Sequence, residues 1–404
     1  MIFSTYFTLV IILLLILIIG VRSFFSLPVL FGIFYIFFYF LPALCFIEEI
    51  SLFNFRLFSI KYHEIISNNR MYWLLFLSNL TVCFFLLPWI GFNTSNYKHI
   101  KVNSLLKYIL YLLLFAIVFS LINNFNSDYF YQLFLPSRKE GLIQSGYQKL
   151  FLVSLPAILL VFAYVRDGNV RLTALLGLLI LFITGQRRII INFLLLALTL
   201  WIFIRNNSKI QIRRFVLIGT LLVLLIPGLW YARSYTTQIQ NNRSEIINPL
   251  STRSPLELIW GSSSSGFETM CYLEAFEDNI DFLPLHSFQY ISASFIPRSV
   301  LPDKPLSITM QIKEDMGLAG NPSIFFTNEM LLNGGVLGVI LAFFVGGMLR
   351  VLIDLWGWKF EIFALANVIT LFKNGFSYFI TEVIFVFLLL LFFSFLSNVI
   401  HRKL

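Results

Sequence analysis

Residues 6–21, YFTLVIILLLILIIGV, carry no charged side chain and decide the fold class of this chain. A segment of this kind can cross the hydrocarbon core of a bilayer as a helix. Ten further apolar segments follow, at 27–46, 71–92, 105–122, 149–165, 172–184, 189–204, 214–231, 335–353, 360–372 and 378–399. Backbone groups in lipid must be satisfied within the segment, so repeated apolar segments indicate helices. The sequence therefore predicts an all-α polytopic membrane protein with about 11 transmembrane helices.

The composition supports the same class. Of the 404 residues, 58% are hydrophobic and 12% are charged, which excludes an ordinary soluble domain. The formal charge of +9 is typical of cytoplasmic Lys and Arg in a membrane protein. No basic run with interleaved aromatics is present, so we expect no nucleic-acid partner. The first segment follows an uncharged N-terminus, and we expect it to be a retained helix rather than a cleaved signal.

The apolar segments divide the chain into three parts. Residues 1–231 form N-terminal transmembrane helices, residues 232–334 form one large external loop with short helices, and residues 335–404 form C-terminal transmembrane helices. The distribution of Lys and Arg among the short loops places the N-terminus outside and the C-terminus inside. This orientation puts Arg187 and Arg188 on the same side of the membrane as the large loop.

Several arginines lie at the membrane ends of these segments. Arg187 and Arg188 lie in the junction 184–188, and two adjacent guanidinium groups suit a phosphate or diphosphate. The alternative is ordinary snorkelling to lipid headgroups. Arg233, which follows Trp230-Tyr231, and Arg253 are weaker candidates for substrate binding, because interfacial aromatics with an arginine also form a common anchor.

The segment 295–305 contains three prolines around Arg298 and Lys304. Proline restricts the backbone and removes a donor, so this segment is predicted to be a rigid non-helical loop that holds both cations in place. The alternative is a stiffened linker with solvated charges.

The following segment predicts a helix that begins at Asn321-Pro322 and continues into the span at 335–353. On this helix Phe325, Glu329 and Asn333 recur every four residues and share a face. An ionisable residue at this place is a functional candidate, which favours a role for Glu329. A stripe of small residues at the same spacing predicts close helix packing: Gly334, Gly338, Ala342 and Gly346.

Other site classes lack support in the sequence. No histidine, cysteine or carboxylate cluster has metal-ligand spacing, so we expect no catalytic metal. The three cysteines, Cys45, Cys83 and Cys271, form no disulfide framework. No phosphate-binding glycine loop is present, which argues against an ATP-driven pump.

Four features together resemble the Wzy-type O-antigen or oligosaccharide repeat-unit polymerases of bacteria. They are Thr-Gly-Gln-Arg-Arg at 184–188, the loop after Tyr-Ala-Arg-Ser at 231–234, Pro-Arg…Lys-Pro at 297–305 and Glu…Asn-Gly-Gly at 329–335. The span pattern agrees over the whole chain, although residues 1–180 are generic. The resemblance implies a GT-C-like fold in the bacterial inner membrane, with the large loop and the active site facing the periplasm.

The resemblance also implies an activity. It implies a metal-independent and cofactor-free glycosyltransferase that acts in lipopolysaccharide or polysaccharide biosynthesis. Such an enzyme transfers the growing glycan from its undecaprenyl diphosphate carrier to the non-reducing end of a second lipid-linked repeat unit. Undecaprenyl diphosphate leaves, and a separate co-polymerase that controls chain length is an expected partner.

The residue chemistry suggests roles at such a site. Positioned cations stabilise the negative charge that gathers on a diphosphate leaving group. The expected cations are Arg187, Arg188, Arg233 and Arg298, with Lys304 in support. The acceptor hydroxyl needs a general base, for which Glu329 is the first choice and His286 the second. Asn333 and Tyr235 are expected to hydrogen-bond sugar hydroxyls.

Three rival functions stay open. An O-antigen ligase uses a similar donor with a lipid A-core acceptor. A transporter or flippase for lipid-linked glycan is expected to place ionisable residues deep within several spans, whereas the charges here lie mostly at span ends. A polyprenyl-monophosphate-sugar transferase usually shows an early external acidic pair, which Glu48-Glu49 could imitate.

Overall fold

The computed structural model describes seven main stretches of the chain. They are residues 1–23, 26–48, 66–93, 264–275, 285–296, 299–315 and 324–403. Helical turns at 156–161, 192–197 and 199–200, and positions 112, 115 and 154, are also described. All regular secondary structure in these residues is helical, as predicted.

The chain divides into two compact units. One consists of Met1–Ser95 with Trp260–Val383, and the other of Asn96–Ile259 with Ile384–Leu404. Most described residues belong to the first unit, which combines residues from all three predicted parts of the chain. Its N-terminal helices therefore form one core with segments that lie far away in the sequence.

The N-terminal helices are α1 (Ile2–Ser23), α2 (Leu27–Tyr35), α3 (Leu41–Ile47) and α5 (Asn68–Leu86). A five-residue π-helix, Ile36–Phe40, joins α2 to α3. Polar groups between these helices bond to one another. Tyr35 donates to Asn79 Oδ1 at 2.7 Å, and Asn79 Nδ2 donates to the Thr5 carbonyl and to Thr8 Oγ1 at 2.9 and 3.0 Å. Polar groups in a lipid environment need hydrogen-bond partners within the protein, because no water is present to provide them.

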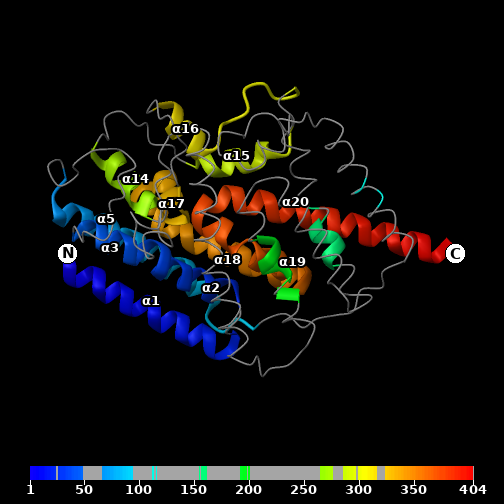
Figure 1. Ribbon diagram of the computed structural model, residues 1–404, viewed down its shortest axis with the longest axis horizontal. Coiled ribbons are helices and arrows are strands. Elements are labelled where there is room, and N and C mark those ends of the chain that lie inside the picture. The colour runs from blue at the N-terminus through cyan, green and yellow to red at the C-terminus, as the bar shows by residue number, and fades with distance from the viewer. Residues whose placement is uncertain are drawn as a thin grey trace, which may run out of the picture. The chain divides into compact units, whose positions relative to one another are not determined.

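Helix α18 (Gly338–Trp356) completes this bundle through the predicted stripe of small residues. A Cβ built at Gly346 would lie 3.2 Å from the Phe85 carbonyl carbon, and Ala342 is fully buried. Four residues further on, Arg350 donates to the Pro88 and Ile90 carbonyls after the end of α5. Helix α18 therefore runs parallel to α5. Helix α1 does too, because Thr5 lies beside Tyr72 and Thr8 beside Cys83 (Figure 1).

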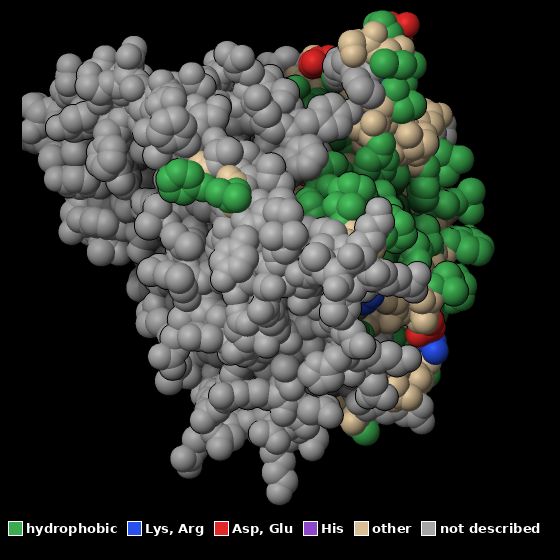
Figure 2. All heavy atoms as spheres, turned by 90° about the vertical axis from the view of Figure 1, so that its right-hand side faces the viewer, with side chains coloured by type: hydrophobic (Ala, Val, Ile, Leu, Met, Phe, Trp, Pro, Cys, Tyr) green, Lys and Arg blue, Asp and Glu red, His purple; other side chains and the backbone are tan. Residues whose placement is uncertain are grey.

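Five described segments are long and apolar enough to cross a membrane. They are Ile2–Val21, Leu27–Ile47, Asn68–Trp89, Phe326–Trp356 and Asn374–Leu396. These overlap the predicted spans at 6–21, 27–46, 71–92, 335–353 and 378–399, with Phe326–Trp356 beginning nine residues before the predicted 335. The predicted spans between 105 and 231 fall largely outside the described residues. On the face shown in Figure 2, the described side chains are mostly hydrophobic, with acidic and basic groups at only a few points.

The predicted span at 360–372 is not one helix. Residues Trp358–Ala366 form α19, and Val368–Lys403 form α20, with a non-helical residue at Asn367 between them. A second break follows at Gly375, whose φ of 84° and ψ of 174° interrupt α20. Asn367 bonds the Phe363 carbonyl through its side chain at 2.9 Å. After α18, the chain therefore forms two short helical segments, α19 and the part of α20 before Gly375, in place of the single predicted span.

The large loop contains four described helices: α14 (Ser264–Ala275), α15 (His286–Ser294), α16 (Ile308–Asp315) and α17 (Phe326–Gly334). The helix predicted from Asn321-Pro322 starts later, at Phe326, because Phe325 is extended. The buried Phe325 ring lies against Gly266, where a Cβ would lie 2.9 Å from its Cγ. Phe325 therefore fixes the start of α17, while Asn321 and Pro322 lie outside the described residues.

Helix α17 also does not continue straight into α18 as predicted. Gly335, with φ of 55°, ends it, and the short 3₁₀ turn Gly335–Leu337 leads into α18. A Cβ at Gly338 would lie 2.6 Å from the Met330 carbonyl carbon, so glycine permits the close return of the chain.

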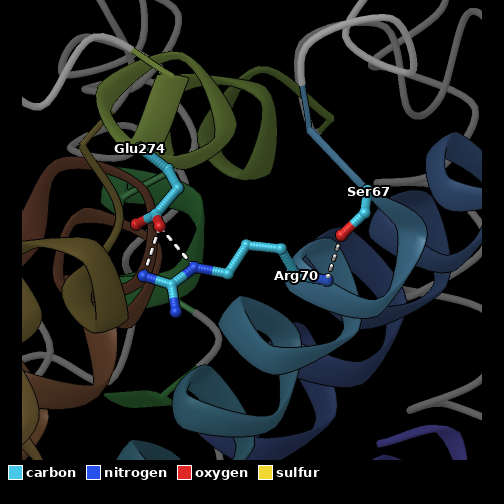
Figure 3. Close-up of polar contacts among 3 residues, drawn as sticks. All are labelled: Ser67, Arg70 and Glu274. Carbon is cyan, nitrogen blue, oxygen red and sulfur yellow. Dashed lines mark hydrogen bonds and ion pairs between the residues drawn. The ribbon is translucent and has the colours of Figure 1, made fainter.

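An ion pair joins α14 to α5. Ser67 caps α5, with its Oγ accepting from the Arg70 backbone N–H at 3.4 Å, and the Arg70 side chain pairs with Glu274 through two nitrogens (Figure 3). The Arg70 side chain is 48% exposed, and exposed ion pairs contribute little to the free energy of unfolding. The pair mainly connects the end of α14 to the start of α5.

Candidate functional site

Glu329 caps the broken helix α20. Its carboxylate accepts hydrogen bonds from the backbone N–H groups of Phe376 and Ser377, the latter at 3.1 Å to Oε1. These are the first free donors after the break at Gly375, and Glu329 itself is fully buried. A helix N-terminus presents such unpaired N–H groups, which a carboxylate satisfies well. Glu329 therefore joins α17 to α20.

This carboxylate lies deep in the first unit. The neighbouring Asn328 accepts a hydrogen bond from Tyr39 at 2.9 Å, and Tyr39 also bonds Ser78 at 3.2 Å. Ser78 is ten residues after Asn68, the start of a candidate span, which corresponds to about 15 Å along the helix axis. Glu329 itself lies three residues after Phe326, where a candidate span begins, and its partners Phe376 and Ser377 lie two and three residues after Asn374, where another begins.

The π-helix before α3 brings Tyr39 to this position. It adds a residue to the turn Ile36–Phe40, and such bulges often occur at functional sites. Tyr39 then stacks with Tyr35 at 5.3 Å between ring centroids and bonds Asn328, whose Nδ2 donates to the Gly266 carbonyl at 2.7 Å. Residue Asn328 thus connects the N-terminal helices with α14.

Asn333 clamps the start of α15. Its Oδ1 accepts from the Ser287 backbone N–H at 2.8 Å, its Nδ2 donates to Ser287 Oγ at 2.8 Å, and its carbonyl accepts from the Leu285 N–H at 3.1 Å. Its Nδ2 also lies 2.6 Å from the Glu329 carbonyl. Both the oxygen and the nitrogen of the Asn333 amide thus bind protein groups, and its role toward sugar hydroxyls stays a prediction.

His286 lies between the two residues that Asn333 holds. Its Nε2 is 2.7 Å from the Leu306 carbonyl oxygen, which can only accept a hydrogen bond. Nε2 therefore carries the proton, and in the neutral ring Nδ1 retains the lone pair that a general base needs. The side chain is partly exposed, in contrast with the buried Glu329.

Lys304 holds the other end of α15. Its Nζ donates to the Ser294 carbonyl at 2.7 Å and to the Ile296 carbonyl at 3.2 Å. A cation at the C-terminus of a helix satisfies carbonyls that have no helical partner. Lys304 thus has the end of α15 as its partner, and its predicted role in substrate binding stays a prediction.

Four of the predicted site residues are described. His286 and Asn333 lie at the start of α15, Glu329 lies one turn before Asn333 on α17, and Lys304 binds the other end of α15. The other six fall outside the described residues: Arg187, Arg188, Arg233, Tyr235, Arg253 and Arg298. Their proposed roles remain predictions.

Several residues of this region were not predicted from the sequence. Ser287, Tyr39 and Asn328 bond to or beside the predicted residues, and Gly375 makes the break that Glu329 caps. The dipeptide Asn374-Gly375 is a turn signal that could have indicated the break. The sequence around Tyr39 contains no comparable signal, because the position of Tyr39 depends on its contacts with Ser78 and Asn328, which lie far away in the chain.

Metal binding finds no support in the described part of the chain, which contains no group of three or more His, Cys, Asp or Glu side chains that could hold an ion. Glu48, part of the acidic pair considered above, accepts a hydrogen bond from the Tyr72 hydroxyl. Comparison with protein-family models, curated proteins and solved structures finds no match to this chain.

Proposed function

We propose that this chain is a membrane-embedded, metal-independent glycosyltransferase that polymerises undecaprenyl-diphosphate-linked oligosaccharide repeat units. In this proposal it acts at the periplasmic face of the bacterial inner membrane. The growing glycan moves to the non-reducing end of a new lipid-linked unit, and undecaprenyl diphosphate leaves. The sequence resemblance and the arrangement around α15 support the proposal.

One observation carries it. The two C-terminal segments that define the resemblance, 297–305 and 329–335, both hold the same helix. Asn333 fixes the start of α15 through Ser287 and Leu285, and Lys304 fixes its end. A helix held at both ends keeps His286 in a defined position, which a general base requires.

The geometry favours His286 over Glu329 as the base. Both Glu329 oxygens accept backbone N–H groups and the side chain is fully buried, so a sugar hydroxyl could reach it only after α20 rearranges. His286 offers an Nδ1 lone pair on a partly exposed ring. It would take the proton of the acceptor hydroxyl as the oxygen attacks the anomeric carbon and the bond to the diphosphate breaks.

Charge on the leaving diphosphate then needs cations. Lys304 uses two of its N–H groups on backbone carbonyls, so the proposal assigns the larger part of this role to Arg298 and the other predicted arginines. A guanidinium fork binds two phosphate oxygens at once, which an ammonium group does not.

The test is the length distribution of surface glycan on a gel. Cells that lack this chain should show single-repeat glycan, and the wild-type gene should restore the ladder. His286→Ala and Arg298→Ala should fail to restore it at equal protein level. Gln289→Ala, on the exposed side of the same helix, is the matched control and should restore it.

Each result has a defined meaning. An unchanged ladder in the deletion strain would refute a role in glycan assembly. Loss of every attached repeat would indicate ligase or transporter. A restored ladder with Arg298→Lys would contradict the need for a guanidinium group at that position.

A second candidate, a transporter for lipid-linked glycan, is favoured by a specific observation. Three carboxylates of the first unit, Glu268, Glu329 and Glu361, are fully buried. Glu329 lies between the helix breaks at Gly335 and Gly375, and interrupted helices are typical of transporter substrate sites.

The two candidates differ in where lipid-linked repeat units accumulate. In the deletion strain, a polymerase defect leaves single units accessible to an external glycosidase in spheroplasts. A transporter defect leaves them protected inside. This result decides between the candidates without any assumption about individual residues.

A further inference from the structure

The Leu306 carbonyl that binds His286 belongs to a turn with supports of its own. His286 Nε2 lies 2.7 Å from this oxygen, which fixes one side of the imidazole ring. The next residue, Ser307, directly precedes α16, and its carbonyl accepts the Met310 and Gln311 N–H groups at 2.8 and 2.9 Å. A peptide unit is planar, so the Leu306 carbonyl cannot turn without moving the Ser307 backbone. Any group that holds Ser307 therefore also holds the partner of His286.

A tyrosine of α20 binds the Ser307 side chain. Ser307 is buried, and its Oγ lies 2.9 Å from the Tyr378 hydroxyl oxygen. The Tyr378 ring also lies beside that of Tyr290 on α15, with centroids 6.1 Å apart. Tyr378 thus contacts both the helix that carries His286 and the turn that supplies the hydrogen-bond acceptor of His286.

Glu329 fixes the place of Tyr378. The tyrosine lies in the first turn after the break at Gly375, directly after the two residues whose N–H groups donate to the Glu329 carboxylate. One turn further along α17, Asn333 binds the Ser287 N–H at the start of α15. Helix α17 therefore supports the backbone beside His286 directly and, through α20, the acceptor of its ring proton.

These supports decide which ring nitrogen carries the proton. In a neutral histidine the hydrogen bond made by one nitrogen sets the tautomer, and the other nitrogen keeps its lone pair. If the Leu306 carbonyl turned away, the proton could move to Nδ1 and the ring could rotate. The lone pair would then leave the position that the proposed base needs.

We propose that Tyr378 is a positioning residue that keeps His286 in its Nε2–H tautomer, through Ser307 and the Leu306 carbonyl. The use of the Nδ1 lone pair in catalysis rests on the proposed function, whereas the effect of Tyr378 on the tautomer does not. Tyr378 itself has no contact with the substrate in this proposal.

The first test is the nitrogen NMR spectrum of isotope-labelled histidine in the full chain in detergent micelles. It is recorded at a pH of about 8.5, where an ordinary histidine ring is neutral. The signals that disappear in His286→Gln belong to His286. In the wild type they should show the proton on Nε2 alone, and in Tyr378→Phe they should show a mixture of both tautomers. Ser307→Ala removes the other hydroxyl of the same pair and should give the same mixture.

Tyr35→Phe is the matched control. It also removes a tyrosine hydroxyl from a hydrogen bond, in this case to Asn79 between the N-terminal helices. It should leave the His286 signals as in the wild type.

The second test is the glycan ladder in cells. Tyr378→Phe should lower the amount of polymer about 10-fold at equal protein level, because a displaced base reacts slowly. Adding Ser307→Ala should lower it little further, because both changes remove one link. Tyr35→Phe should restore the full ladder.

A wild-type tautomer in both Tyr378→Phe and Ser307→Ala would overturn the proposal, because another group would then hold the ring. A changed tautomer with a full ladder would also overturn it, because the ring position would then have no part in the reaction. A ladder restored by His286→Ala would refute the base itself, and the NMR spectrum would still decide whether Tyr378 holds the ring. Failure of the proposed function and failure of this inference are therefore distinguishable.

Discussion

Replacing Gly375 by alanine tests the cap between Glu329 and α20 most directly. A Cβ at this position would overlap Glu329 Oε2 and lie 2.9 Å from its Cδ, and the three nearest atoms all belong to that one side chain. The carboxylate must therefore leave. It would lose its hydrogen bonds from Phe376 and Ser377, which together contribute about 3–6 kcal/mol when the acceptor is charged.

The backbone adds a second term. Gly375 has φ of 84° and ψ of 174°, a region that alanine occupies at a cost of about 1–3 kcal/mol. The control is Gly357, with φ of 64° and ψ of −153°, where a Cβ meets nothing within 4 Å. Gly357→Ala should show the backbone term alone, so the difference between the two variants measures the loss of the cap, about 3 kcal/mol or more.

The assay is reversible SDS titration in mixed micelles, followed by helical circular dichroism. Gly375→Ala should unfold at a much lower SDS fraction than Gly357→Ala. In the Glu329→Ala background, Gly375→Ala should cost little beyond the backbone term, because no carboxylate remains to displace. Equal losses for the two glycine variants, or additive effects of Gly375→Ala and Glu329→Ala, would refute the cap.

Three further outcomes are expected. Asn333→Ala should destabilise the protein by about 2–4 kcal/mol in the same titration, because it leaves buried partners on α15 unpaired, whereas a loss below 1 kcal/mol would contradict the clamp. A double-mutant cycle between Arg70 and Glu274 should give a coupling of only about 0.2–1 kcal/mol that decreases with salt, because the arginine is exposed. Burial raises the pKa of the Cys271 thiol, and Glu268 and Glu274 raise it further, so the folded state holds the proton where the unfolded state releases it. Stability should therefore fall as pH rises above the unfolded pKa of about 8.5, and Cys271→Ala should make that fall less steep in unfolding experiments over pH 7 to about 9.5.

Apolar run length was enough to locate the well-described helices. The span predicted at 27–46 appears at Leu27–Ile47, and that predicted at 71–92 at Asn68–Trp89, because the cost of burying charge in lipid sets both limits. The small-residue stripe was also correctly assigned to packing, since Gly346 allows α18 to approach Phe85.

The length of apolar runs did not predict the interruptions within helices. Hydropathy averages over many residues and does not register one positive φ angle, so the breaks at Gly335 and Gly375 were missed. The start of α17 depends on the fit of Phe325 against Gly266, a contact between residues about sixty positions apart. For the same reason, the sequence offered Glu329 as a candidate site residue but did not indicate its partners on α20.

The order in which the first unit is synthesised follows from its two separate pieces. Met1–Ser95 emerge from the ribosome first, and Trp260–Val383 complete the core later. At about 5–20 residues per second, translation of residues 96–259 takes roughly 8–33 s. The hydrogen bonds of Asn79 with Tyr35 and Thr8 lie entirely within Met1–Ser95. These polar groups can therefore be paired in the membrane before the later piece is synthesised. Tyr39 has Ser78 as an early partner and gains Asn328 only on assembly, which makes this tyrosine one of the points where the late piece joins the early one.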